Sequence, residues 1–219
     1  MGREAGVTAT KKQNQPVIIF DFMGVVFTEG MVLSNLLVPM FRPPLSFQEI
    51  RGRYRRFVVG DIGSDAFWRG MVPDGPRAER AYLDRFELAE GFEVVLDLKR
   101  SHTLAVLSEV PAAWGDYLVR KFELDRIFDV MVLSGHVGVT KPDIRIFQMV
   151  LEKLGRDRDY AFIDDNHENL AVASTLGWRT IWMNQPSRFG RSGYTPDMTI
   201  RGLGELKGLF LESRPERLA

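Results

Sequence analysis

The chain has 219 residues, enough for one sizeable domain or for one domain that carries a smaller insert. Hydrophobic residues make up 45% of the chain and its formal net charge is zero, so we expect a buried core and no global field that would recruit nucleic acid or an anionic membrane. Cysteine is absent, which excludes disulfides, thiolate catalysis and thiolate zinc sites and is typical of a reducing compartment.

The amino-terminal segment is polar. Residues 1–15 contain no apolar core segment, so we expect a flexible tail rather than a signal peptide. The longest apolar run, residues 31–41, is interrupted by Asn35 and Pro39 and is too short to span a bilayer. These features predict a cytoplasmic protein that has no membrane partner.

Short apolar runs alternate with helical periods over much of the chain. This alternation predicts an α/β fold, a doubly wound Rossmann-like parallel sheet with helices on both faces. The runs are nearly continuous in apolar residues, as expected for strands that are covered on both sides. The predicted strands are Val17–Phe20, Thr103–Leu107, Asp129–Leu133, Tyr160–Ile163 and Thr180–Trp182, and a loop from Tyr194 to Met198 precedes a last short strand and helix.

Two helices between these strands have clear boundaries in the sequence. Pro142 fits the first helical position, and Gly155 ends the apolar stripe that follows it. Asn166 can cap the next helix, which Gly177 ends. The first stripe consists of Ile144, Phe147, Val150, Leu151 and Leu154.

The long interval between the first two strands contains no convincing strand. Its segments 46–57, 64–72 and 76–88 have the pattern of short amphipathic helices separated by proline and glycine. An insert that leaves the sheet directly after the first strand would lie over the sheet's ligand edge as a helical cap. We therefore expect a core formed by residues 16–27 and 99–212 and a cap formed by residues 28–98.

Polar residues follow four of the predicted strands. Asp21 comes after the first strand, Ser108 after the second, Lys141 after the third, and Asp164-Asp165 after the fourth. The carboxyl ends of parallel strands meet at one edge of the sheet, where such folds place their ligands. Adjacent carboxylates after a buried strand repel each other unless a cation lies between them. The four pieces therefore predict a shared site that holds a metal ion.

At these positions the chain resembles the haloacid dehalogenase-like (HAD) hydrolase superfamily, over about residues 16 to 212. Gly60-Asp61 with Ser64-Asp65-Ala66-Phe67 also resembles the small helical cap of its sugar-phosphate phosphatases, and the nearest subgroup is glucose-1-phosphate phosphatase-like. The core motifs that carry the resemblance are Ile19-Phe20-Asp21-Phe22-Met23-Gly24-Val25, Val106-Leu107-Ser108, Lys141-Pro142-Asp143 with Arg145-Ile146-Phe147, and Phe162-Ile163-Asp164-Asp165-Asn166 followed by Asn169-Leu170 and Leu176-Gly177.

The resemblance implies phosphoryl transfer to Asp21. Its carboxylate would attack phosphorus in line and form an aspartyl-phosphate. Lys141 would hold a phosphoryl oxygen and offset the charge on Asp21, while the Ser108 hydroxyl would bind another oxygen. Asn169, one turn along the helix from Asp165, would orient Lys141 or a metal-bound water.

A carboxylate that approaches a phosphate dianion needs a cation to offset the repulsion. Magnesium prefers near-octahedral oxygen ligands and keeps several waters. We expect Asp21, the backbone carbonyl of Met23, Asp164 and Asp165 to supply the protein ligands of Mg²⁺.

Met23 departs from the pattern of the family's phosphatases. Their second aspartate, at this position, protonates the leaving oxygen and then activates water, help that is worth typically about 10²–10⁴-fold. A thioether can do neither. The sequence therefore favours substrates with good leaving groups, such as sugar-1-phosphates, acyl phosphates or aryl phosphates. Glu109 is a candidate substitute acid or base, unless it is a helix-entry or salt-bridge residue, and His136 and His167 are further candidates unless they are solvated loop residues.

Three other functions remain open. The main alternative is a catalytically weak or silent member that binds a phosphorylated ligand or a protein partner. A haloacid dehalogenase is less expected, because those enzymes typically lack a metal-binding pair such as Asp164-Asp165. Phosphonate cleavage through a Schiff base is less expected still, because residues 28–98 contain no lysine.

The predicted cap should determine specificity. Arg51, Arg53, Arg55 and Arg56 lie on one predicted helix, and Arg51 and Arg55 are candidate contacts to an anionic substrate; the alternative is a solvated basic face. Phe67-Trp68 fits the cap's own core better than a substrate platform. We expect the partner to be a small phosphorylated metabolite rather than nucleic acid, and the sequence indicates no particular oligomeric state.

Overall fold

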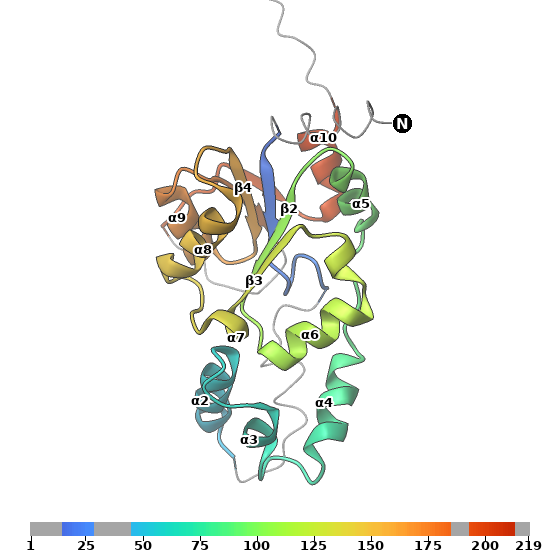
Figure 1. The fold of residues 1–219 in the computed structure, drawn as a ribbon, viewed down its shortest axis with the longest axis vertical. Coiled ribbons are helices and arrows are strands. Elements are labelled where there is room, and N and C mark those ends of the chain that lie inside the picture. The colour runs from blue at the N-terminus through green and yellow to red at the C-terminus, as the bar shows by residue number, and fades with distance from the viewer. Residues whose placement is uncertain (1–14, 29–44, 185–192, 213–219) are drawn as a thin grey trace, which may run out of the picture.

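The computed structural model describes residues 15–28, 45–184 and 193–212. Six parallel strands form one sheet in the order β3-β2-β1-β4-β5-β6, which confirms the predicted fold class (Figure 1). The five strands for which the sequence predicts bounds each lie within one residue of those bounds. The strands are β1 (Val17–Phe20), β2 (Leu104–Ser108), β3 (Val130–Leu133), β4 (Tyr160–Asp164), β5 (Arg179–Met183) and β6 (Met198–Ile200).

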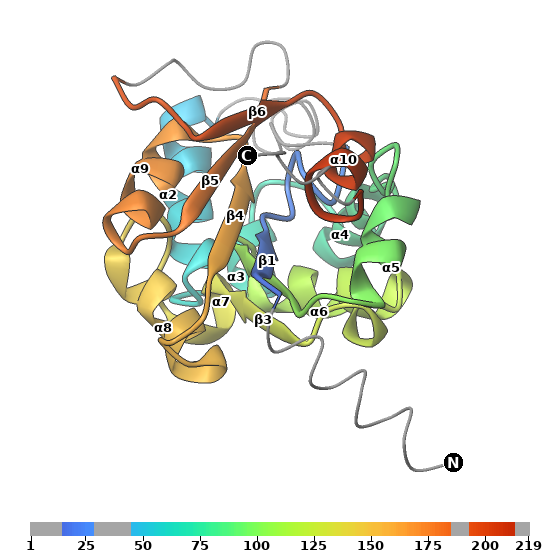
Figure 2. The same ribbon diagram turned by 90° about the horizontal axis from the view of Figure 1, so that it is seen from above.

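Helices cover both faces of the sheet. Figure 2, which looks down on the fold, shows α8 (Ile144–Leu154) and α9 (His167–Thr175) on one side of the sheet and α5 (Glu93–Lys99), α6 (Ala112–Lys121) and α10 (Leu206–Phe210) on the other. Alternate residues of β1 enter two separate cores: Val17 and Ile19 pack with α8 and α9, while Ile18 and Phe20 pack with the opposite layer. The continuous apolar runs in the sequence therefore arise from burial on both faces.

The ends of α8 and α9 follow from local chemistry. The prediction that Pro142 occupies the first helical position is wrong. Asp143 caps α8, because its carboxylate accepts the backbone N–H of Arg145 at 2.9 Å, and the helix begins one residue later. Gly155 ends α8 with φ 91°, and Asn166 caps α9 as expected.

Three helices form a separate layer beyond the carboxyl ends of the strands, at the bottom of Figure 1. They are α2 (Phe47–Val58), α3 (Ser64–Trp68) and α4 (Gly75–Leu83), and the last two are shorter than the predicted segments. A capping box starts α2: Ser46 accepts the backbone N–H of Glu49, while the Glu49 carboxylate accepts the backbone N–H of Ser46.

Two connecting segments join this layer to the sheet. Thr28 N–H donates to Glu87 O at 3.2 Å, and Ala89 N–H donates to Val26 O at 2.9 Å. The helix that follows, α5, lies within the interval 28–98 that we expect to form the cap except for its last residue, and it contacts α10 and the short 3₁₀ turn η4 (Leu203–Glu205).

Two of the sequence predictions concern residues outside the described ranges. They are most of the expected tail 1–15 and the apolar run 31–41. Within the described ranges, no helix has the length and apolar composition required to cross a lipid bilayer.

Candidate active site

Asp21 lies at the carboxyl end of β1, at the start of a tight turn. Its backbone N–H continues the sheet ladder to Ile163 O at 3.0 Å, and its side chain is 10% exposed. Phe22 N–H donates to Asp21 Oδ1 at 2.7 Å and so orients the carboxylate. Gly24, at φ 80°, reverses the chain and donates its N–H to Phe27 O, a conformation that few residues other than glycine adopt.

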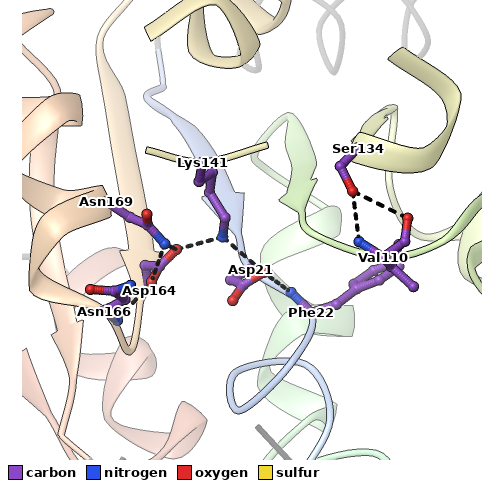
Figure 3. A network of polar contacts seen from close by, with 8 residues as sticks. All are labelled: Asp21, Phe22, Val110, Ser134, Lys141, Asp164, Asn166 and Asn169. Atoms are coloured by element: carbon purple, nitrogen blue, oxygen red, sulfur yellow. Dashed lines mark hydrogen bonds and ion pairs between the residues drawn. The ribbon is translucent and has the colours of Figure 1, made fainter. Parts of the chain in front are cut away.

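Lys141 joins the ends of two neighbouring strands (Figure 3). Its Nζ lies 3.0 Å from Asp21 Oδ1 and 2.6 Å from Asp164 Oδ2, and the lysine and Asp164 side chains are fully buried. Burial alone would lower the pKa of Lys141, but the charges of Asp164 and Asp21 outweigh it and raise the pKa. The lysine is therefore cationic and is held between two carboxylates.

Asp164 is fixed by further hydrogen bonds (Figure 3). Asn169 Nδ2 donates to both carboxylate oxygens, at 3.1 and 3.0 Å, and Asn166 N–H donates to Oδ1 at 2.7 Å. Burial raises the pKa of Asp164 to about 6, although Lys141 and the hydrogen bond from Asn166 oppose this shift. The direct contact of Asn169 is with Asp164, so this asparagine positions the carboxylate.

The geometry at this edge fits a divalent cation. Asp21, Asp164 and Asp165 are all buried, and each offers a carboxylate oxygen within 4.8 Å of the others. The backbone oxygen of Asp165 accepts the indole N–H of Trp182 at 3.1 Å, which fixes the main chain at this point. Lys141 is paired with two of these carboxylates, and clustered carboxylate oxygens are the ligands that Mg²⁺ prefers.

Ser108, the last residue of β2, is 0% exposed, and its hydroxyl has no hydrogen-bond partner. A buried polar group without a partner is costly, so an unpaired hydroxyl at a strand end indicates a ligand position. β2 lies directly beside β1, with Phe20 opposite Val106. Ser108 therefore ends at the same edge as Asp21, as the sequence predicts.

Glu109 follows Ser108 and is partly buried. Burial raises its pKa to about 7; the charges of Asp21 and Asp164 add to this shift, while Lys141 opposes it. The charges of the carboxylate cluster and of Lys141 therefore act on the Glu109 carboxyl group as well. At neutral pH this environment favours either a protonated Glu109 or a cation close to it.

Met23 is partly buried and packs against the main hydrophobic core. Its backbone forms an isolated parallel bridge to Phe27, so the turn after Asp21 is intact without an aspartate at this position. The Met23 thioether stands at the position where the resemblance places the second aspartate of the family's phosphatases. The effect of Met23 is therefore chemical rather than conformational.

The other predicted residues are dispersed. Arg51 and Arg55 are exposed on α2, so the structure leaves their role as substrate contacts a prediction. His136 is exposed and lies 2.9 Å from Asp116. His167 is 5% exposed rather than solvated, because its ring packs edge-on against Trp182 with centroids 4.3 Å apart.

Sequence reasoning missed Tyr54. It lies on α2, and the charges of Glu109 and Asp21 act on its phenol. The signal for it was present in the sequence, because Ile50, Tyr54 and Phe57 follow the i, i+4, i+7 spacing of one helical face. Ile50 and Phe57 are both buried.

Comparison with known proteins agrees with this geometry. Residues 77–183 match the family model of the haloacid dehalogenase-like hydrolases. An (S)-2-haloacid dehalogenase from Pseudomonas sp. strain YL is 29% identical over 76% of this chain and 71% of its own. A phosphoserine phosphatase from Thermus thermophilus is 31% identical over 52% of this chain and 45% of its own.

A solved HAD family enzyme from Bacteroides thetaiotaomicron, in complex with magnesium and inorganic phosphate, shares the fold with a TM-score of 0.62 and 18% identity. The alignment covers 80% of this chain and 98% of that one. The family match over residues 77–183, the shared fold and the carboxylates at adjoining strand ends thus make the chain similar to the haloacid dehalogenase-like hydrolases.

Proposed function

We propose that the protein is a magnesium-dependent phosphohydrolase that acts on a small phosphorylated metabolite through an aspartyl-phosphate on Asp21. The observation that carries this proposal is the buried Lys141, which is paired with Asp21 at 3.0 Å and with Asp164 at 2.6 Å inside a cluster of three carboxylates. Such a cluster combines an oriented nucleophile with a fixed positive charge and cation ligands. Phosphoryl transfer depends on these three features.

The first step forms a bond between Asp21 and phosphorus while the bond from phosphorus to the leaving oxygen breaks. Phe22 N–H and Lys141 both hold Oδ1, so Oδ2 is the oxygen available for attack. Lys141 and the unpaired Ser108 hydroxyl stabilise charge on the phosphoryl oxygens. In the second step a water oxygen displaces Asp21 from phosphorus and yields inorganic phosphate.

Asp21, Asp164, Asp165 and the backbone carbonyl of Met23 would hold Mg²⁺, as the oxygen-rich cluster favours. When bound, this ion supplies positive charge that offsets repulsion between a phosphate dianion and the carboxylates. The magnesium and phosphate bound by the Bacteroides relative support this assignment.

Met23 limits the range of leaving groups. Because its thioether cannot donate a proton to the leaving oxygen, the first step favours leaving groups that depart as stable anions. Acyl and aryl phosphates and sugar-1-phosphates meet this condition, and the last class agrees with the resemblance to glucose-1-phosphate phosphatases. Glu109, whose pKa burial raises to about 7, is the substitute base that we propose for the hydrolytic water.

The haloacid dehalogenase relative supports a second candidate function, because 76% of this chain aligns with it. Displacement of halide from carbon requires no proton, so Met23 would not hinder it. Two features favour phosphoryl transfer instead. The Asp164-Asp165 pair adds negative charge that halide displacement does not need, and Glu109 would repel the carboxylate of a haloacid.

Turnover of 4-nitrophenyl phosphate tests the proposal when the wild type is compared with Asp21→Asn, with magnesium and with a chelator. We expect phosphate release by the wild type in magnesium and loss of at least about 10³-fold in the variant, since the nucleophile is gone. Equal turnover by the two proteins would reject the mechanism. Chloride release from 2-chloropropionate without phosphate release would favour the dehalogenase, and neither activity would favour a silent phospho-ligand-binding protein.

Thermal unfolding tests the metal site independently of activity. Magnesium should raise the Tm of the wild type, because an ion that binds only the folded state stabilises it. Asp165→Asn should lose this shift. Asp157→Asn makes the same change at an exposed position and should retain it. An equal shift in all three proteins would place the metal elsewhere.

A further inference from the structure

Glu109 and Asp164 lie on opposite sides of Asp21. In the sheet order, β2 flanks β1 on one side and β4 flanks it on the other. Glu109 directly follows β2, and Asp164 ends β4. The Asp164 side holds the buried lysine and the clustered carboxylates, and the Glu109 side carries the unpaired Ser108 hydroxyl. A ligand bound at Asp21 would therefore extend beside Glu109.

Tyr54 reaches the same side from the cap. Burial raises the pKa of its phenol, and the negative charges of Glu109 and Asp21 add to the shift, so Tyr54 is neutral and lies within the field of both carboxylates. Its ring lies against Phe67 and Trp114, with centroids 6.3 and 6.1 Å apart. Tyr54 is therefore an uncharged hydroxyl beside an acidic side chain.

Trp114 of α6 fixes the position of Tyr54. Its indole N–H donates to Glu79 Oε2 at 2.8 Å, and the same oxygen accepts the indole N–H of Trp68 at 2.6 Å. At the carboxyl end of α2, the Ser134 hydroxyl donates to Val58 O at 2.7 Å. These contacts join the cap helices to α6 and α7 (Ser134–Val137), so Tyr54 belongs to a wall with a defined place relative to Asp21.

Charge at this wall is unbalanced. Within the described part of the chain, no ion pair joins Glu109 to a lysine, arginine or histidine, which argues against a salt-bridge role for it. Three further carboxylates lie nearby, and Lys141 is paired with two of them, Asp21 and Asp164. With a divalent ion bound, a phosphoryl dianion would still leave net negative charge at the site. A ligand that brings another anion to Glu109 would be repelled, and a ligand that brings a cation would be attracted.

We propose that Tyr54 and Glu109 form the specificity wall of the site and select ligands whose leaving group presents an ammonium or hydroxyl donor rather than a carboxylate or a second phosphate. This inference rests on the proposed function only in placing the phosphoryl group at Asp21. It narrows the substrate class to phosphorylated amino or polyhydroxy compounds. Glu109 accepts the hydrogen bonds of the donor group, and the Tyr54 hydroxyl lies beside it.

Calorimetric binding of three phosphonates in magnesium tests the proposal without turnover, because a phosphonate has no bridging oxygen to cleave. The three are 2-aminoethylphosphonate, ethylphosphonate and 3-phosphonopropionate, which present an ammonium, a neutral methyl and a carboxylate. We expect Kd to rise in that order, with at least about tenfold between the first and the last. Equal affinities, the reverse order, or no binding of any of them would overturn the proposal.

Variants assign the preference to the wall. Glu109→Gln should reduce the ratio of the Kd for 3-phosphonopropionate to the Kd for 2-aminoethylphosphonate to about threefold or less. The affinity for ethylphosphonate should stay nearly the same. Tyr54→Phe should raise the Kd for 2-aminoethylphosphonate by roughly threefold, because one hydroxyl is lost. Glu152→Gln, the same change at an exposed position of α8, should leave all three affinities unchanged.

The outcomes separate this proposal from the proposed function. An ammonium preference that Glu109→Gln leaves intact would overturn the role of the wall even if the protein hydrolyses phosphate esters. An ammonium preference that depends on Glu109, in a protein that releases no phosphate, would support the role of the wall and contradict the proposed phosphohydrolase activity.

Discussion

The two walls of the site are held by different forces. On the core side, Asp21 and Asp164 end adjacent parallel strands, and Lys141 pairs directly with both carboxylates. On the cap side, Tyr54 is placed by the packing of aromatic rings around Trp114, which joins helices far apart in sequence. A sheet ladder and buried ion pairs define the first wall, and side-chain packing defines the second.

This difference predicts different consequences of mutation. A change on the core side should leave a buried charge unpaired and so affect both folding and chemistry. A change on the cap side should loosen packing and shift ligand preference, while the reacting groups remain in place.

The largest effect is expected for Lys141→Met. The variant leaves Asp164 buried beside Asp21 with no cation, so the free energy of unfolding should fall by about 3–5 kcal/mol in urea denaturation without magnesium. Lys153→Met, the same change at an exposed position of α8, should alter it by less than about 0.5 kcal/mol. If the two variants are equally stable, the ion pairs do not define the core wall.

Met23→Asp tests whether the missing proton donor limits the chemistry on the core side. It restores a group that can protonate a leaving oxygen, so hydrolysis of an alkyl phosphate should rise by about 10²-fold, and hydrolysis of 4-nitrophenyl phosphate should rise much less. Steady-state kcat/KM for the two substrates measures the difference. A similar gain for both, or no gain, would show that proton donation is not what limits this site.

Trp114→Phe tests the cap wall. Loss of the indole and of its hydrogen bond to Glu79 should cost about 1–2 kcal/mol of unfolding free energy. Because Tyr54 would lose part of its support, KM should rise about threefold or more while kcat for an aryl phosphate changes little. A fall in kcat at constant KM would instead connect Trp114 to the chemistry.

The smallest effect concerns the pH dependence of stability at Glu109. Burial raises the pKa of this carboxyl from 4.5 to about 7, so the folded protein holds its proton more tightly than the unfolded chain does. The stability that this proton contributes is fully present below about pH 4.5 and is lost as the pH rises through 7.

Between pH 5 and 8 in chelator, the free energy of unfolding of the wild type should therefore fall by roughly 1 kcal/mol more than that of Glu109→Gln, because partial exposure reduces the full shift. Denaturation curves at several pH values measure the difference. Parallel stability profiles for the two proteins would show that Glu109 titrates alike in the folded and unfolded states.

The sequence predicted the core wall well, and there are physical reasons for this. A parallel strand buried on both faces appears as a continuous apolar run, and the polar residue that ends it lies at a known edge. The sequence alone could therefore assign four residues to one site: Asp21, Ser108, Lys141 and Asp164. The prediction that failed near this wall is the start of α8 at Pro142. The carboxylate of Asp143 caps the helix instead, so the helix begins at Ile144.

The cap wall was not predictable to the same extent. The helices could be located from their amphipathic pattern, but the face that α2 turns toward Asp21 depends on contacts with Trp114, sixty residues further along the chain. Charge drew attention to Arg51 and Arg55, which are exposed, whereas Tyr54 resembled an ordinary core residue. The sequence left open whether His167 is solvated, because its burial depends on Trp182 of β5.

Acid-quenched mass spectrometry after mixing the protein with acetyl phosphate and magnesium tests the central claim most directly. We expect a phosphoryl group on Asp21 in magnesium that is absent in chelator and in Asp165→Asn. An Asp21 that stays unmodified at every quench time, whether or not phosphate is released, would contradict it.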